Sequence, residues 1–228
     1  MTALTSPPRL RASEGCLQTR GGVVRWRLGV RDPAEAASTV ARAWVEEIVR
    51  THGLFAWTGF AAVPPFSKPR FASDGADFSV SHSGGFVLVA VGVGVRVGVD
   101  VEAAPFEAFR SAALRRRMLT PAEHDRLARV PTDARLPHLA RVWTAKEALV
   151  KASGEGLRRD FRRFAVPALL EAPVFRLEAA LAVLSRDAPP EVHRLTPPLA
   201  APMPDAPPEA PSSIPLPAAP EAALTELS

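Results

Sequence analysis

Val95-Arg96-Val97-Gly98-Val99-Asp100-Val101-Glu102 alternates valine with a residue of another kind at every second position. This period of two predicts a β-strand whose valines form one apolar face. Asp100 and Glu102 then lie together on the opposite face. A pair of acids on a strand most often only marks the face of the strand that is exposed to solvent. The pair indicates a functional site only in combination with other motifs in the chain.

A second stretch, Trp143-Thr144-Ala145-Lys146-Glu147-Ala148-Leu149-Val150-Lys151, predicts a helix. Because Trp143, Glu147 and Lys151 follow one another at intervals of four residues, they lie on one stripe of that helix. If this stripe meets the acidic face of the strand, three carboxylates and a lysine converge. Three oxygen ligands, completed by water or a substrate phosphate, are how Mg²⁺ is usually bound. The ordinary alternative is a surface ion pair beside a core tryptophan.

Lysine is rare in this chain, which has 28 basic residues of which only three are lysines: Lys68, Lys146 and Lys151. Two of them lie on the predicted acid-bearing helix, and the third precedes Phe78-Ser79-Val80-Ser81-His82-Ser83. A compact ammonium differs from a guanidinium mainly at phosphates and in proton transfer. Chance survival of three lysines in an arginine-biased sequence is the alternative.

Charge and proline content divide the chain into two parts. From Asp187 onward there are 12 of the 24 prolines, six acids and one arginine, and no hydrophobic period, so we expect a largely disordered Pro/Ala-rich tail. Residues 1–186 carry 27 basic and 18 acidic side chains. This net positive charge predicts an anionic partner: nucleic acid, a phosphorylated cofactor or an acidic protein.

Cysteine content and hydropathy limit the compartment. Cys16 is the single cysteine, which excludes an intramolecular disulfide and a cysteine-based zinc cluster and fits a reducing compartment. The most apolar window, residues 86–101, is shorter than a membrane span and is interrupted by glycines and Arg96. No apolar run follows the arginines near the N-terminus, so we expect no secretory signal. The expectation is a soluble, cytoplasmic protein that does not bind membranes.

The hydrophobic patterns predict an α+β protein with two similar lobes in one chain, each a small antiparallel sheet packed on a long helix. We expect an N-terminal lobe over residues 1–94, a C-terminal lobe over 95–186 that contains the acids, and the tail over 187–228. The site is expected in the cleft between the lobes. The expected helices are 33–50, 121–130 and 137–153, with a further helical region after Pro105. The expected strands are 23–30, 54–63, 78–82, 86–91, 95–102, 161–166 and 174–184, although 179–184 could equally be helical.

The order of these motifs resembles the 4′-phosphopantetheinyl transferase superfamily, in particular its two-lobed members that activate peptide and polyketide synthases (the surfactin-synthetase-activating type). Lys68-Pro69, Phe78–Ser83 and Gly98–Glu102 are similar to three family motifs, and Trp143–Lys151 with the trailing Gly154-Glu155-Gly156-Leu157 is similar to a fourth. Met118–Glu123 also resembles a family helix start. Ser67 stands where the family usually has glycine. The resemblance covers residues 68–157.

The resemblance implies transfer of phosphopantetheine from coenzyme A to a serine of an apo acyl or peptidyl carrier protein, with release of adenosine 3′,5′-bisphosphate. It implies that Mg²⁺ is held by Asp100, Glu102 and Glu147, which would stabilise the leaving phosphate. Glu147 would also take the serine proton, directly or through a bound water, and Lys151 would contact the phosphate under attack and could protonate the leaving oxygen.

The same resemblance implies residues that bind coenzyme A. His82 would contact the pyrophosphate or the 3′-phosphate and Lys68 the 3′-phosphate, with Ser81 in the same motif as His82. Lys146 would be a helper near the phosphates. The carrier protein, which is acidic in this class, would dock on the basic helix Arg110–Arg117, with Met118 and Leu119 as its apolar centre.

Two other functions remain open at this point, and a monomer is expected in each. One is a Mg²⁺-dependent phosphodiesterase or nuclease, although the basic residues are not interleaved with aromatic ones as nucleic-acid binding favours. The other is a non-catalytic carrier-protein binder with a decayed coenzyme A pocket. It is favoured by the N-terminal helix, where the family carries basic residues for the nucleotide and this chain has only Arg42 and Arg50.

Overall fold

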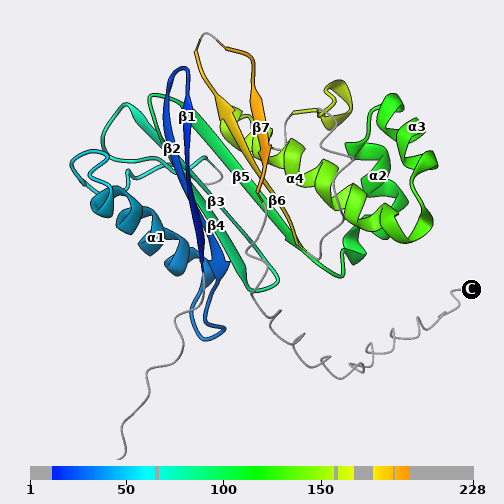
Figure 1. Cartoon of the computed structure of the whole chain (residues 1–228), viewed down its shortest axis with the longest axis horizontal. Helices are drawn as coiled ribbons and strands as arrows, with labels where there is room; N and C mark the ends of the chain where they lie inside the picture. The colour runs from blue at the N-terminus through cyan, green and yellow to red at the C-terminus, as the bar shows by residue number, and fades with distance from the viewer. Residues whose placement is uncertain (1–11, 65–66, 157–158, 167–176, 187, 196–228) are drawn as a thin grey trace, which may run out of the picture.

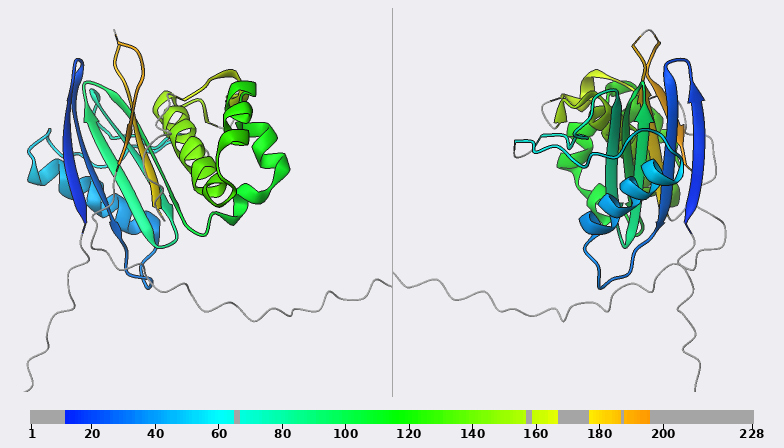
Figure 2. Two further views of the ribbon diagram at one scale, coloured as in Figure 1. Left: turned by 45° about the vertical axis from the view of Figure 1, so that its right-hand side comes forward. Right: turned by 90° about the vertical axis from the view of Figure 1, so that its left-hand side faces the viewer.

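The structure, a computed structural model, describes residues 12–64, 67–156, 159–166, 177–186 and 188–195. Two antiparallel sheets lie face to face, with a single helix covering one of them and the remaining helices covering the other, so the molecule has four layers (Figures 1 and 2). This arrangement confirms the prediction of an α+β fold. Within the described residues, no helix has the length and apolar character needed to cross a membrane.

The first sheet has the strand order β1-β2-β4-β3 and is covered on its outer face by one helix. Its strands β4 and β2 are antiparallel neighbours, and β3 is an edge strand. Valines at alternate positions of β4 pack against the covering helix, while Phe86, Leu88 and Ala90 face the second sheet. Burial on both faces explains why this strand is a continuous apolar run. The bounds are β1 Ser13–Thr19, β2 Gly22–Val30, α1 Ala37–Thr51, β3 Ala76–Ser83 and β4 Phe86–Val93.

The second sheet has the order β5-β6-β7 and packs against a long helix, α4. The valines of β5 join the core between the two sheets, as their alternation predicts. β5 pairs along its whole length with β6, so β5 is also an edge strand. The bounds are β5 Arg96–Ala103, η1 Glu107–Arg110, α2 Ala112–Met118, α3 Pro121–Arg129, η2 Thr132–Ala134, α4 Arg135–Ser153, η4 Phe161–Arg163, β6 Leu177–Leu184 and β7 Glu191–Arg194.

Helix α4 approaches β5 unusually closely at Gly98. A Cβ atom placed there would lie 1.9 Å from the carbonyl oxygen of Ala148 and 2.4 Å from the amide nitrogen of Ala152. Only glycine allows this approach, because any side chain would collide with the helix backbone. The close packing sets the helix beside Asp100, which follows Gly98 on the same face of the strand.

Three sequence predictions differ from the structure. The tail predicted to be disordered from residue 187 includes β7, which pairs with β6 and whose Arg194 bonds to buried Glu178; residues 196–228 lie outside the described part. Residues 54–63 form a single bridge, between Phe60 and Phe71, and no strand, because their aromatic rings pack with Phe71 and Phe78. In 161–166, the described backbone makes a 3₁₀ turn capped by Asp160.

Candidate active site

The predicted stripe of α4 does face the acids of β5. Lys151 donates to Asp100 Oδ1 at 2.7 Å and to Ser81 Oγ at 3.1 Å, so three elements, α4, β5 and β3, meet at this point. The side chain of Asp100 is 7% exposed and that of Lys151 is 30% exposed. Burial raises the pKa of Asp100, and the ammonium of Lys151 opposes that rise.

Glu102 lies one strand step further along the same face of β5. It accepts a hydrogen bond from Ser83 Oγ at 3.1 Å. Burial and the charge of Asp100 raise the pKa of Glu102, whereas hydrogen bonds from Ser83 and Trp143 oppose this rise. Trp143, the first residue of the α4 stripe, therefore contacts the second acid, as Lys151 contacts the first. It also stacks on Phe161, with ring centroids 5.4 Å apart.

Glu147 is half-buried between Trp143 and Lys151 on the α4 stripe. Burial first, and then the charge of Asp100, raise the pKa of Glu147 to about 7, although Lys151 opposes the shift. Lys151, one turn further along α4, contacts Asp100 directly, so this stripe of the helix faces the acids of β5. We call Asp100, Glu102, Glu147 and Lys151 the acid–lysine cluster. The two acidic stretches that the sequence places forty residues apart therefore converge.

Two oxygens of this cluster fit a further cation. Asp100 Oδ2 and Glu147 Oε1 are buried and have no hydrogen-bond partner among the described residues. Buried polar atoms are rarely left unpaired, and hard carboxylate oxygens are the ligands that Mg²⁺ prefers. The described part of the chain nevertheless contains no set of three His, Cys, Asp or Glu side chains already arranged to hold a metal ion. Lys151 and Ser81 occupy Asp100 Oδ1 and Ser83 occupies Glu102 Oε2, so a cation would bind the other oxygen of each carboxylate.

Lys68 lies at the other end of β5 and is bound within the protein. Its ammonium pairs with Asp77 and donates to the carbonyl oxygen of Val97 at 2.7 Å. Burial lowers the pKa of Lys68, and Asp77 partly offsets this effect. A phosphate at Lys68 would compete with Asp77 for the ammonium, so its predicted contact with the 3′-phosphate stays a prediction.

Lys146 does not occupy the predicted place near the phosphates. Its side chain is fully buried and donates to the carbonyl oxygens of Met118 and Phe161 at 2.7 and 2.8 Å and to Glu123 Oε2 at 2.6 Å. An ammonium has three protons, and all three are used here. The structure therefore corrects this prediction. We call Lys146, Glu123 and these two carbonyls the Lys146 cluster.

Glu123 joins the Lys146 cluster to the start of α3. It accepts the backbone N–H of Thr120 at 2.8 Å and completes the capping box expected from the sequence. Its other oxygen accepts the N–H of Val166 at 3.3 Å. A single buried carboxylate thus ties α3, α4 and the segment after η4 together. The role of Lys146 near the phosphates was implied by the resemblance alone, since the stripe predicted from the sequence contains Glu147 and Lys151 but not Lys146.

Ser81 and His82 lie on opposite faces of β3. Ser81 faces β5, whereas Phe78 and Val80 on the other face pack in the core beneath α1. His82 shares the face of Phe78 and Val80 and is exposed at the end of the strand. Because β3 is an edge strand, one ligand could contact both residues only by passing around that edge. Their roles in binding coenzyme A stay predictions.

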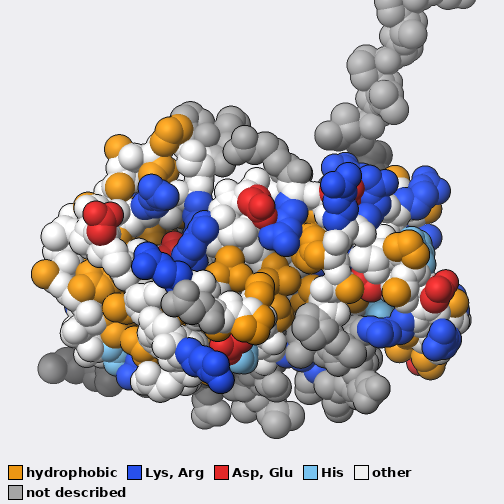
Figure 3. Space-filling model, turned by 90° about the horizontal axis from the view of Figure 1, so that it is seen from above, with side chains coloured by type: hydrophobic (Ala, Val, Ile, Leu, Met, Phe, Trp, Pro, Cys, Tyr) orange, Lys and Arg blue, Asp and Glu red, His pale blue; other side chains and the backbone are white. Residues whose placement is uncertain are grey.

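The basic surface proposed for docking is partly different from the prediction. Met118 and Leu119 are 0% and 3% exposed and belong to the core, so they form no apolar surface centre. Arg110 pairs with Glu107, and Arg115 donates to the carbonyl oxygen of Arg110 at 2.6 Å. Seen from above, Lys and Arg side chains are nevertheless more widespread than Asp and Glu, and they surround an apolar strip (Figure 3).

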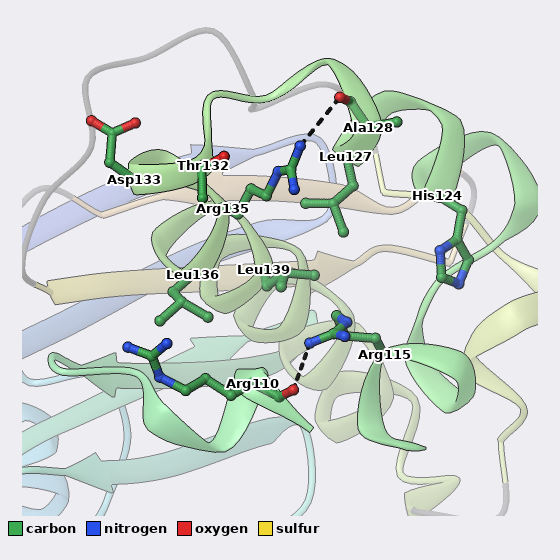
Figure 4. A pocket seen from close by; sticks show the side chains of 10 residues that line it. All are labelled: Arg110, Arg115, His124, Leu127, Ala128, Thr132, Asp133, Arg135, Leu136 and Leu139. Atoms are coloured by element: carbon green, nitrogen blue, oxygen red, sulfur yellow. Dashed lines mark hydrogen bonds between the residues drawn. The ribbon is translucent and has the colours of Figure 1, made fainter. Parts of the chain in front are cut away.

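A pocket of about 660 Å³ lies among α2, α3, η2 and the start of α4, away from the acid–lysine cluster. Leu127, Leu136 and Leu139 form its apolar part, and Arg110, Arg115 and Arg135 lie around them (Figure 4). Arg135 is held by the carbonyl oxygen of Val130 at 3.0 Å. The pocket contains none of the residues predicted for catalysis or for coenzyme A.

Two polar residues of β3, Asp77 and Ser83, contact the predicted site residues but were not themselves predicted. Asp77 accepts from Lys68 and from the N–H of Val97, and Ser83 contacts Glu102. The signal was present, because Asp77, Ser79, Ser81 and Ser83 alternate along one strand. The alternation indicates contacts with β5 only when β3 is known to lie beside β5.

Carboxylates whose pKa values are raised by burial and that lie beside a specific charged partner mark candidate functional sites. Residues 96–186, which contain β5 and α4, match the family model described as the 4′-phosphopantetheinyl transferase superfamily. The resemblance of the chain to this superfamily is therefore confirmed, and its matched segment carries the entire acid–lysine cluster.

Two relatives support the same family. One is the 4′-phosphopantetheinyl transferase HetI of Nostoc sp., 34% identical over 96 residues, which are 42% of this chain and 40% of the relative. Another, from Synechocystis sp., is named as a putative 4′-phosphopantetheinyl transferase and is 32% identical over 81 residues, 35% of this chain and 32% of the relative. The chain thus matches well under half the length of these relatives.

Proposed function

We propose that this protein transfers the 4′-phosphopantetheine group of coenzyme A to a serine of an apo acyl or peptidyl carrier protein and releases adenosine 3′,5′-bisphosphate. The observation that carries the proposal is the meeting of Asp100 and Glu102 on β5 with Glu147 and Lys151 on α4, within the segment that matches the superfamily. Phosphoryl transfer is catalysed mainly by stabilising the charge on the phosphate oxygens and by positioning the nucleophile, and this cluster contains carboxylates and an ammonium suited to these tasks.

Asp100, Glu102 and Glu147 are the residues that would hold Mg²⁺. The ion would neutralise the pyrophosphate oxygens and stabilise the leaving phosphate. The fit rests on Asp100 Oδ2 and Glu147 Oε1, which are buried and lack hydrogen-bond partners among the described residues. It also rests on the raised pKa values of all three acids, since a nearby cation would favour their charged forms.

Glu147 and Lys151 would move the protons of the reaction. Glu147, with its pKa raised to about 7 by burial, is suited to accept the proton of the carrier serine hydroxyl near neutral pH. Lys151 would contact the phosphate under attack and give a proton to the oxygen that leaves with adenosine 3′,5′-bisphosphate. Because Lys151 is one turn from Glu147 on α4, both can act on one phosphorus.

Intact-mass analysis tests the proposal directly. An apo carrier protein is incubated with this protein, coenzyme A and Mg²⁺, and EDTA is added to a parallel sample. A gain of one phosphopantetheine group that disappears with EDTA is the expected result. No gain across acyl and peptidyl carrier proteins would contradict the proposal.

A non-catalytic carrier-protein binder is the second candidate, and a specific observation favours it. Two of the lysines expected near coenzyme A, Lys68 and Lys146, are bound to Asp77 and Glu123 instead. Isothermal titration with coenzyme A in the presence of Mg²⁺ separates the two functions. Saturable binding favours the transferase, whereas carrier-protein binding without coenzyme A binding favours the decayed homologue.

A further inference from the structure

Two edge strands, β3 and β5, lie side by side and are joined by side chains of β3. Four alternate side chains of β3 accept hydrogen bonds from four alternate backbone N–H groups of β5. Each acceptor precedes its donor by 20 residues. We call this set of contacts the seam: Asp77 with Val97 at 2.9 Å, Ser79 with Val99 at 3.0 Å, Ser81 with Val101 at 3.4 Å and Ser83 with Ala103 at 3.2 Å.

The seam solves a problem that β5 creates. As an edge strand, β5 directs every second N–H away from β6, and a buried N–H without a partner costs about 1–3 kcal/mol. Short polar side chains on β3 satisfy these groups at the junction of the two sheets. The Ser-x-Ser-x-Ser spacing of β3 is therefore a structural requirement of the junction as well as a sequence motif.

Two seam serines make a second contact, and it goes to the acids. Ser81 Oγ donates to Asp100 Oδ1 at 2.8 Å, and Ser83 Oγ donates to Glu102 Oε2 at 3.1 Å. In both cases the hydroxyl oxygen accepts a hydrogen bond from the N–H of the residue that follows the acid, and the hydroxyl donates a hydrogen bond to the acid itself. A serine has one proton to donate, so the backbone contact leaves that proton for the carboxylate.

Ser79 makes only the first of these contacts. It accepts the N–H of Val99, and the residue before Val99 is Gly98, which has no side chain to receive a hydrogen bond. Ser79 and Ser83 thus share the strand, the face and the backbone contact. They differ in the carboxylate that only Ser83 reaches, which makes Ser79 a matched control.

We propose that Ser83, together with Ser81, is a positioning residue that orients the carboxylates of β5 toward a divalent metal. This inference rests on the proposed function, because that function supplies the metal. Ser83 is the cleaner case, since Ser81 also accepts from Lys151. Hydrogen bonds to metal-ligating carboxylates fix their orientation, and removing such a partner typically costs about 10- to 100-fold in metal affinity.

Binding of Mn²⁺ to the full chain, measured from the electron paramagnetic resonance signal of the free ion with coenzyme A present, tests the inference. We expect Ser83→Ala to weaken Mn²⁺ binding by about tenfold and Ser79→Ala to leave it unchanged. In urea unfolding of the same two variants, we expect the opposite order, with the larger loss of stability in Ser79→Ala. Ser79 is 4% exposed, whereas Ser83 is half-buried, so Ser79→Ala should lose more stability.

A second pair of variants tests whether Ser83 acts through Glu102. In a Glu102→Gln background, Ser83→Ala should cause no further loss of Mn²⁺ affinity. A further loss as large as in the wild type would overturn the inference, as would equal losses in Ser79→Ala and Ser83→Ala. Wild-type affinity in Ser83→Ala would overturn it and leave the proposed function intact. A wild-type protein that neither binds Mn²⁺ nor modifies a carrier would overturn both.

Discussion

Lys146 and Lys151 are five residues apart on α4 and have similar partners but different surroundings. Lys146 lies 2.6 Å from Glu123, and Lys151 lies 2.7 Å from Asp100. Lys146 is fully buried, and its ammonium is saturated by one carboxylate and two carbonyl oxygens. Lys151 is 30% exposed and lies beside carboxylate oxygens that lack partners among the described residues.

The comparison separates a charge that serves the fold from charges available for chemistry. A buried ion pair whose hydrogen bonds are all made fixes the elements that supply its partners. Buried carboxylates with unused oxygens retain the capacity to bind a ligand or a proton, and such groups are common at functional sites. The two lysines have the same charge and residue type. They differ in whether the carboxylates beside them still have oxygens without a hydrogen-bond partner.

The largest effect is expected at the acid–lysine cluster. Glu147→Gln should lower the rate of phosphopantetheine transfer by at least about a hundredfold, because it removes a proton acceptor. The fold should remain intact, since the amide keeps the shape of the side chain and removes a buried charge. The rate is measured by intact mass of the carrier, and the fold by circular dichroism and urea unfolding.

Glu155→Gln is the matched control for that variant. Glu155 follows α4, its side chain is 53% exposed, and it pairs with Arg159. This variant should transfer at the wild-type rate. Near wild-type transfer by Glu147→Gln would contradict the assignment of the cluster to catalysis.

The second prediction compares the two lysines. Replacing Lys146 should mainly reduce stability, whereas replacing Lys151 should mainly reduce transfer activity. Lys146→Met should destabilise the protein by about 3–5 kcal/mol, because it leaves Glu123 buried without its cation. Lys151→Met should lose less stability, since its partly exposed site allows solvent to reach the cluster, and should lose most of the transfer activity. Urea unfolding and carrier mass measure the two effects. Equal loss of stability in both variants would remove the distinction between the clusters.

The sequence predicted the acid–lysine cluster because both of its parts are periodic. Valine alternation placed Asp100 and Glu102 on one face, and the interval of four placed Glu147 and Lys151 on one stripe. It failed at Lys146, because a neighbouring lysine in the same motif has no periodic feature that marks it as buried. Its acceptors come from residues 118, 123 and 161, which only tertiary packing brings together.

The fold shows the same difference between segments with a strong periodic pattern, which were predicted, and a segment without one, which was not. The strands around β4 and β5 were predicted because their apolar patterns are strong, whereas β7 was missed because its four residues lie among prolines and acids. β7 is stabilised by pairing with the preceding strand β6 and by the bond between Arg194 and buried Glu178, and the composition of the tail shows neither contact. The composition of the tail predicts disorder there, and strand pairing with β6 overrides it.

Gly98→Ala gives the third prediction, which concerns the spacing between α4 and β5. Its Cβ would lie 1.9 Å from the backbone oxygen of Ala148, so the helix must move away from the strand. We expect a loss of about 1–3 kcal/mol in urea unfolding, because overpacking a tight contact costs this much. Transfer activity should also fall, since Lys151 would be displaced from Asp100. Wild-type activity would show that the spacing does not matter to the acid–lysine cluster.

The smallest effect concerns His138, which lies on α4 near the Lys146 cluster. Burial first, and then the charges of Arg141 and Arg126, lower the pKa of His138 below its ordinary value of 6.5, although Glu123 opposes the shift. The folded protein therefore binds fewer protons at this residue than the unfolded chain does. The stability that His138 contributes is present above about pH 6.5 and is lost as the pH falls through the lowered pKa.

His138→Gln removes this proton linkage and leaves the other titrating groups in place. Between about pH 7 and pH 5, the urea midpoint of the variant should fall less than that of the wild type. His52→Gln, at an exposed position after α1, should keep the wild-type dependence. If His138→Gln follows the wild type at every pH, the buried side of α4 contributes no pH dependence to folding. A reduced slope would instead place part of the acid sensitivity on the side of α4 that serves the fold, apart from the acids proposed for catalysis.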